Sequence, residues 1–222
     1  MYTPQSLFFK RLKEEWKFQI RVWKMAVDWT IALYIIIPAA IISVMYYISW
    51  WEELPVWSDF ISTPLLFGIT FLFIVSGTIR LFIEEADQLF LLQRPTWIQQ
   101  LKLYGIVYSI ISFAITSLLF FFLLLPLFIF LANWSFLQVG IYIIFSYSSK
   151  IFFSFLKQRV DQRFHGIKYS IDITFLFIFF GASFVLVSMT FANQPAVLLI
   201  VSILLAAASV LFAKASIQTS SF

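Results

Sequence analysis

The chain has 222 residues, 62% of them hydrophobic and 12% charged, and its mean hydropathy is +0.94. Soluble domains are about 45–50% apolar and about 25% charged, so this composition indicates a protein whose solvent is lipid. The absence of cysteine excludes disulfides and thiolate chemistry. The net charge of +4 does not indicate a nucleic-acid partner, because the basic residues are confined to short segments beside apolar runs.

Residues 1–28 are the first predicted element, a basic amphipathic helix. Their apolar residues recur at three- and four-residue spacing, which places them on one helical face. Such a helix lies in the cytoplasmic headgroup region and leads into a membrane span. Two roles remain open: a topology anchor, or an elbow helix that transmits movement to the first span. The residues predicted to lie at the membrane surface are Lys10, Lys13, Trp16, Lys17, Arg21, Trp23 and Lys24.

Residues 29–214 are predicted to form an all-α transmembrane domain, followed by a short tail at 215–222. A helix needs roughly 20 apolar residues to cross the hydrocarbon core. Six runs meet this requirement, although the third contains Pro126 and the fourth contains Lys150. The predicted spans are Trp29 to Ser49, Ile61 to Ile83, Tyr104 to Phe130, Leu137 to Leu156, Ile173 to Phe191 and Ala196 to Ala213.

The basic residues predict the orientation of these spans. All fifteen Lys and Arg residues belong to the N-terminal segment, the second and fourth connections or the C-terminal end. By the positive-inside rule, both termini are therefore expected in the cytoplasm, in a multi-pass protein of the bacterial plasma membrane. Tryptophans favour the headgroup level. Those expected at the outer face are Trp50, Trp51, Trp57 and Trp134.

The second connection contains a candidate docking segment. Its acidic residues open a short predicted helix, where carboxylates favour the positive end of the helix dipole. Pro95 disfavours helix at Arg94, so the chain is expected to turn there. The acidic start and the aliphatic run that follows suit a helix that fits a groove on a cytoplasmic protein. The alternative is a solvated continuation of the second span.

Ionisable residues are scarce inside the predicted spans. Lys150 lies near the cytoplasmic end of the fourth span, where a lysine is expected to extend toward the headgroups. Ser76, Gly77 and Thr78 form a small-residue patch at which helices could approach closely.

Catalytic chemistry finds no support in the sequence. There is no phosphate-binding G-x-x-x-x-G-K-[ST] motif, and the lone His165 excludes a metal site built on paired histidines. All eleven acidic residues fall at or beyond the span boundaries, which disfavours a proton-driven carrier. The chain is therefore expected to be no enzyme and to hold no cofactor. Any energy source is expected on another subunit.

Two stretches carry a family resemblance. The run from Glu85 to Pro95, with its acidic start and Leu-Phe-Leu-Leu core, resembles the loop after the second span in bacterial ABC-2-type permeases, in particular the EcsB type. The run from Arg11 to Ala39 is similar to the N-terminus of those proteins. EcsB-type permeases are longer, so a half-size relative or a truncated product is expected.

The resemblance implies an exporter permease subunit that pairs with a separate cytoplasmic ATPase, which would bind the ATP. Membrane lipids and a second copy of the chain are further expected partners. The loop after the second span would act as a coupling helix against the ATPase. The contact residues carried over are Glu84, Glu85, Asp87, Leu89, Phe90, Leu91 and Arg94.

A second hypothesis comes from a different class of protein. A non-transporting scaffold or regulator could recruit cytoplasmic partners or anionic lipid through the N-terminal helix and the basic fourth connection. The shortage of polar residues in the spans favours it, since no substrate path is evident.

Overall fold

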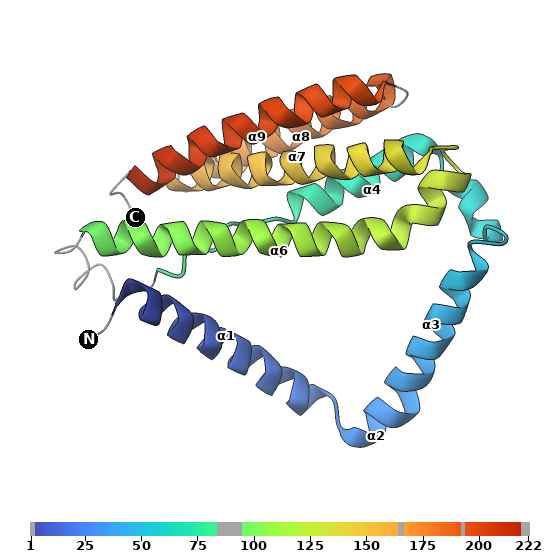
Figure 1. The fold of residues 1–222 in the computed structure, drawn as a ribbon, viewed down its shortest axis with the longest axis horizontal. Helices are drawn as coiled ribbons and strands as arrows, with labels where there is room; N and C mark the ends of the chain where they lie inside the picture. The colour runs from blue at the N-terminus through green and yellow to red at the C-terminus, as the bar shows by residue number, and fades with distance from the viewer. Residues whose placement is uncertain (1–2, 84–94, 164–166, 192–193, 219–222) are drawn as a thin grey trace. The chain divides into compact units, whose positions relative to one another are not determined.

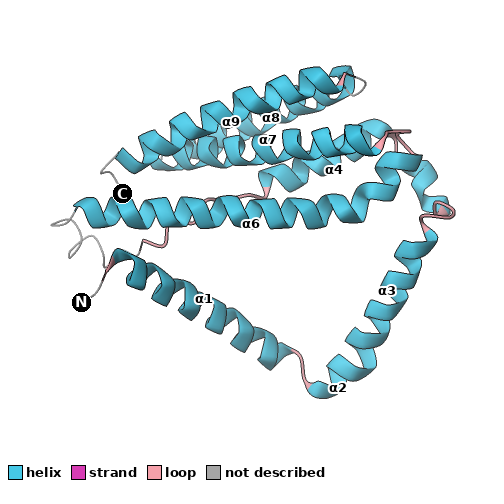
Figure 2. Cartoon of the chain, in the orientation of Figure 1, coloured by secondary structure: helices cyan, strands magenta, loops and turns pink. Residues whose placement is uncertain are grey.

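In the computed structural model, which describes residues 3–83, 95–163, 167–191 and 194–218, all regular structure is helical (Figures 1 and 2). The chain divides into two compact units. One contains residues 1–56 and 81–104, and the other contains residues 57–80 and 105–222.

The first unit begins with α1 (Pro4–Ala26), which confirms the helix predicted for the N-terminal segment. Thr3 caps it, because its hydroxyl accepts a hydrogen bond from the Ser6 amide while Ser6 Oγ accepts one from the Thr3 amide. This reciprocal pair satisfies two amides that a helix start otherwise leaves unpaired. Pro4 occupies the first turn, where its missing N–H has no consequence.

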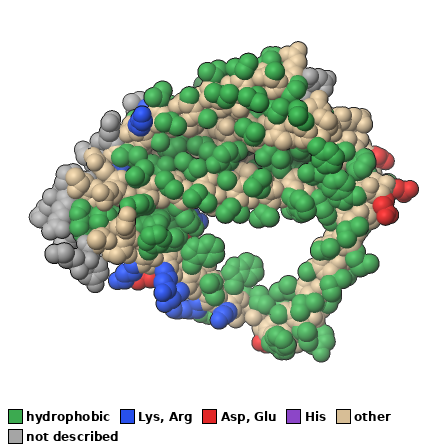
Figure 3. All heavy atoms as spheres, viewed as in Figure 1, with side chains coloured by type: hydrophobic (Ala, Val, Ile, Leu, Met, Phe, Trp, Pro, Cys, Tyr) green, Lys and Arg blue, Asp and Glu red, His purple; other side chains and the backbone are tan. Residues whose placement is uncertain are grey.

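The second helical run of this unit covers the first predicted span with the same boundaries. It consists of α2 (Trp29–Ile31), the π-helical turn η1 (Ala32–Ile36) and α3 (Ile37–Ser49). The π turn lies just before Pro38, which offers no N–H to the helix and crowds the carbonyl of Tyr34. Figure 3 shows the hydrophobic side chains that cover this run, in contrast to the Lys and Arg gathered on α1.

The second unit is built around α7 (Phe136–Arg163), which packs against α4 (Thr63–Val75), α8 (Ile167–Phe191) and α9 (Pro195–Gln218). The short 3₁₀ turn η2 (Val56–Phe60) precedes α4. The remaining helix, α6 (Pro95–Phe130), is 36 residues long and contains Pro126. It begins in the first unit and continues through the second.

Tyr142 lies at the centre of an aromatic core in this unit and is fully buried. Its ring lies within 5.2–6.4 Å of six other aromatic rings, which come from α4, α6, α7, α8 and the α6–α7 turn. One of them is Trp134, which is only 6% exposed. Trp134 therefore packs inward rather than serving as the headgroup anchor that the sequence predicted. The six neighbours are Phe67, Phe121, Phe128, Trp134, Phe145 and Phe184.

The second predicted span is helical over only part of its length. α4 ends at Val75, and residues 77–83 are not helical, so the prediction of one helix over Ile61–Ile83 is wrong beyond Val75. At the break, Ser76 Oγ donates to the Phe73 carbonyl and the Arg80 amide donates to Ser109 Oγ of α6. Side chains thus replace helical hydrogen bonds, a condition for irregular backbone at membrane depth.

Within the described part of the chain, four helices are long and apolar enough to cross a membrane, as an all-helical, polytopic membrane protein requires. Two further predicted spans contain shorter apolar helices, Thr63–Val75 and Phe177–Phe191, so the count of six stays a prediction. The four long helices cover Trp29–Ser49, Thr96–Phe130, Phe136–Val160 and Pro195–Ile217.

Candidate functional site

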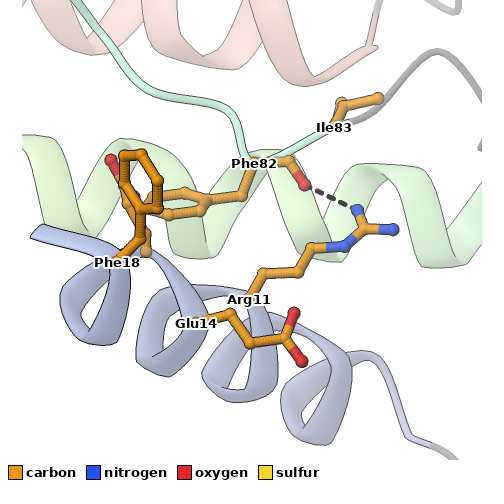
Figure 4. A pocket seen from close by; sticks show the side chains of 6 residues that line it. Arg11, Glu14, Phe18, Phe82 and Ile83 are labelled. Carbon is orange, nitrogen blue, oxygen red and sulfur yellow. Dashed lines mark hydrogen bonds between the residues drawn. The ribbon is translucent and has the colours of Figure 1, made fainter. Parts of the chain in front are cut away.

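The first unit fixes the chain directly before the predicted docking segment. Arg11 of α1 donates a hydrogen bond of 2.7 Å from Nη1 to the carbonyl oxygen of Phe82 (Figure 4). A guanidinium donor makes this bond stronger than a neutral one. Because Phe82 lies two residues before Glu84, the bond ties the N-terminal helix to the chain that leads into residues 84–94.

Aromatic packing reinforces that bond. Phe8 is 5% exposed, and its ring centroid lies 5.1 Å from that of Phe82 and 5.6 Å from that of Tyr104. The contact with Phe82 is edge-to-face, at an interplanar angle of 76°, a geometry that aromatic pairs favour. We call Phe8, Arg11, Phe82 and Tyr104 the Phe82 cluster. It joins three segments that are distant in sequence: α1, the end of the second predicted span and the start of α6.

Phe82 itself has a left-handed backbone, with φ at 54°. A bulky residue rarely adopts this conformation, because its Cβ crowds the following carbonyl group. Such strain persists only where surrounding contacts hold it, and it is concentrated at functional and switching positions. The Phe82 cluster supplies those contacts.

A pocket of 410 Å³ opens beside the cluster (Figure 4). Phe18 of α1, together with Phe82 and Ile83, gives it an apolar part, and α1 also contributes charged groups of both signs. The pocket thus combines apolar and charged side chains at the point where the chain leads into residue 84. Its lining residues are Arg11, Glu14, Glu15, Phe18, Phe82 and Ile83.

The predicted coupling residues lie outside the described residues, so their role stays a prediction. They are Glu84, Glu85, Asp87, Leu89, Phe90, Leu91 and Arg94.

The predicted membrane-surface residues all lie on α1, and each of them is exposed. Trp16 is 52% exposed and Trp23 is 69% exposed, so both indoles are accessible to a headgroup layer. Their membrane-surface role stays a prediction. These seven residues of α1 are Lys10, Lys13, Trp16, Lys17, Arg21, Trp23 and Lys24.

Sequence reasoning missed the Phe82 cluster. The positive-inside rule uses Arg11 only to orient the chain, and hydropathy places Phe82 and Tyr104 at the ends of apolar spans. Only the positions of these residues in the folded chain bring them together, because 71 residues separate the two partners of the Arg11–Phe82 hydrogen bond.

Sequence reasoning also missed a polar stripe inside the second unit. Five residues on one face of α7 are each at most 3% exposed, where an apolar span was expected. The available signal was the spacing of these five residues, which follow one another at intervals of four, three, one and four positions and so lie on one side of a helix. The polar stripe consists of Tyr142, Ser146, Ser149, Lys150 and Ser154.

Comparison with known proteins places this architecture in a family. Residues 5–222 match the family described as "Bacterial ABC transporter protein EcsB". The chain is 36% identical over 157 residues to a protein of Bacillus subtilis (strain 168) named "Putative transporter YthQ". That match covers 69% of this chain and 41% of the relative, so the chain spans about two fifths of the length of the relative. No solved structure matches.

The family match covers almost the whole chain, and the four long apolar helices agree with its membrane character. The resemblance read from two short stretches of sequence is thereby confirmed. The chain belongs to the EcsB family of bacterial ABC transporter proteins and is a membrane protein of the bacterial cell membrane.

Proposed function

We propose that this chain is a permease subunit that receives the movement of a separate cytoplasmic ATPase through residues 84–94, which we call the coupling segment. Membrane components of ABC transporters typically have no ATPase activity themselves, so the family implies an ATPase partner. The observation that carries the proposal is the Phe82 cluster, which holds the chain immediately before the coupling segment.

The physical requirement for coupling is a stiff connection on both sides of the contact. Before the segment, the Arg11 bond and the Phe8 packing attach the chain to α1. After it, Pro95 begins α6, which continues without a loop to Phe130. A force on the segment therefore acts on a long helix, and helices transmit displacement with little internal deformation. This arrangement favours the elbow role for α1 over a topology anchor.

The remaining assignments are parts of the same proposal. Both termini and the coupling segment face the cytoplasm, and the exposed basic and aromatic residues of α1 contact headgroups. The second span crosses as the α4 helix followed by the non-helical residues 77–83. α4 alone has 13 residues and is about 20 Å long, whereas the hydrocarbon core is about 30 Å thick. We propose export as the direction of transport, and a second copy of the chain is one candidate for completing the assembly.

The scaffold hypothesis loses its main support. It depended on a shortage of polar residues in the spans, and the polar stripe on α7 supplies buried polar groups there. Intramembrane polar residues are costly in lipid and are concentrated along transport pathways.

Co-purification tests the coupling proposal. The full chain, solubilised in detergent, is expected to retain a co-expressed ABC-type ATPase. A Leu89→Asp/Phe90→Asp variant should lose it, because two carboxylates would replace the apolar contact. The matched control is Val56→Asp/Phe60→Asp, an exposed aliphatic and an exposed aromatic position of the turn η2. Unchanged retention by the Leu89/Phe90 variant would show that the contact is elsewhere.

A further inference from the structure

Lys150 is a buried cation in the middle of the second unit. It is 3% exposed, so its side chain turns into the helix bundle instead of extending toward the headgroups as the sequence predicted. Its Nζ lies 3.4 Å from the centroid of the Phe73 ring and 5.4 Å from that of Phe113. Phe73 belongs to α4 and Phe113 to α6, so three helices surround the ammonium group.

The ammonium has no anionic partner in the described part of the chain. The described residues give Nζ aromatic contacts but no hydrogen bond and no ion pair. The sequence places no Asp or Glu between residues 60 and 83 or between 88 and 160. An ammonium has three N–H donors, and a cation–π contact recovers only a fraction of the penalty of removing it from water.

The chain packs closely against the Lys150 side chain. Gly77, in the non-helical stretch after α4, lies so close that a Cβ there would come within 3.2 Å of Lys150 Cε and 2.7 Å of Ser154 Oγ. Ser149, the preceding residue on α7, has a buried hydroxyl that makes no hydrogen bond within the described residues. The site therefore offers a cation among phenylalanine rings, with a second buried polar group on the same helix.

We propose that Lys150 binds the anionic group of an amphiphile, a carboxylate or phosphate attached to an apolar body. The charge complements the ammonium, and the Phe73 and Phe113 rings accommodate the adjoining apolar chain. Such a molecule has two sources: an anionic lipid of the bilayer or a separate amphiphile that the protein transports. Only the second rests on the proposed transport function, and binding itself requires no ATPase.

Photo-crosslinking of the full chain in phosphatidylcholine nanodiscs tests the site. The probes are a long-chain fatty acid that carries a diazirine and its methyl ester, which has the same body without the charge. The acid is expected to label the peptides around Phe73 and Lys150 at least about fivefold more than the ester. Lys150→Met should reduce labelling by the acid to the ester level, and Lys150→Arg should retain it, because the positive charge is kept.

Lys214→Met is the matched control, because it removes a lysine that is exposed on α9. It should label like the unaltered chain. Equal labelling of the unaltered chain by acid and ester would overturn the proposal, whether or not Lys150→Met folds. Replacement of part of the phosphatidylcholine by phosphatidylglycerol identifies the source. Strong competition supports a bilayer lipid in the site, and weak competition supports a separate anionic amphiphile.

Discussion

Arg11 Nη1 donates a 2.7 Å hydrogen bond to the carbonyl oxygen of Phe82, and this bond connects the N-terminal helix to the chain two residues before the coupling segment. The helix α1 is thereby attached to the chain that leads into the segment that we propose to contact the ATPase. The bond supports our proposal that α1 takes part in coupling and is not only an anchor.

Arg11→Ala should loosen α1. The bond has a charged donor but is only partly buried, so we expect its loss to reduce the free energy that holds α1 in place by about 1 kcal/mol. That corresponds to an increase of about fivefold in the open fraction of α1. The chain has no native cysteine, so maleimide reactivity of a single Leu12→Cys substitution reports the opening. Arg21→Ala, at an exposed position of α1, is the control. Equal reactivity in the two variants would count against the bond.

Phe82→Gly and Phe82→Ala should differ in stability. Both remove the aromatic contacts with Phe8, but only glycine adopts a φ of 54° without strain. We expect the glycine variant to be more stable by about 1 kcal/mol, the usual penalty of a left-handed conformation. Thermal unfolding of the detergent-solubilised protein measures the difference. A more stable alanine variant would mean that Phe82 is not left-handed.

The sequence predicted the helices well where hydropathy alone decides them. The first predicted span and the α2–α3 run share their boundaries, because charged Asp28 and the polar outer connection flank a purely apolar stretch. The prediction of one helix for the second span failed beyond Val75, because hydropathy measures transfer into lipid and carries no information about backbone conformation. Hydrogen bonds of Ser76 and Ser109 stabilise the break in the helix there, and no local sequence pattern predicts it.

The candidate sites were less predictable. The coupling segment is predicted from its own residues and stays a prediction, whereas the Phe82 cluster depends on three segments that only the fold brings together. The small-residue patch at Ser76–Thr78 was predicted as a point where helices approach closely, and the chain at Gly77 does lie close to α7. The patch itself is not helical, however, and it approaches a buried lysine of α7 and not a second helix across a helix face.

Gly77→Ala should destabilise the second unit. The added Cβ would lie 2.7 Å from Ser154 Oγ and 3.2 Å from Lys150 Cε, so we expect a loss of about 1–3 kcal/mol from overpacking. Ser154→Ala removes the nearer atom and should restore part of the loss. The unfolding temperatures of the single and double variants measure this coupling.

Gly68→Ala provides the matched control for that pair. No atom outside the glycine's own helix neighbourhood lies within 4 Å of a Cβ at Gly68, and alanine favours a helix by about 1 kcal/mol. Gly68→Ala should therefore be neutral or stabilising. A similar loss in both glycine variants would rule out close packing at Gly77 as the cause.

The central claim is that the coupling segment is the site at which a cytoplasmic ATPase binds. The most direct measurement is quantitative co-purification of that ATPase with the full chain, compared between the unaltered protein and Leu89→Asp/Phe90→Asp. We predict at least about a tenfold loss of bound ATPase in the variant, since each carboxylate would be buried unpaired at the contact. Equal amounts of bound ATPase in the two preparations, at equal yields of folded permease, would contradict the account.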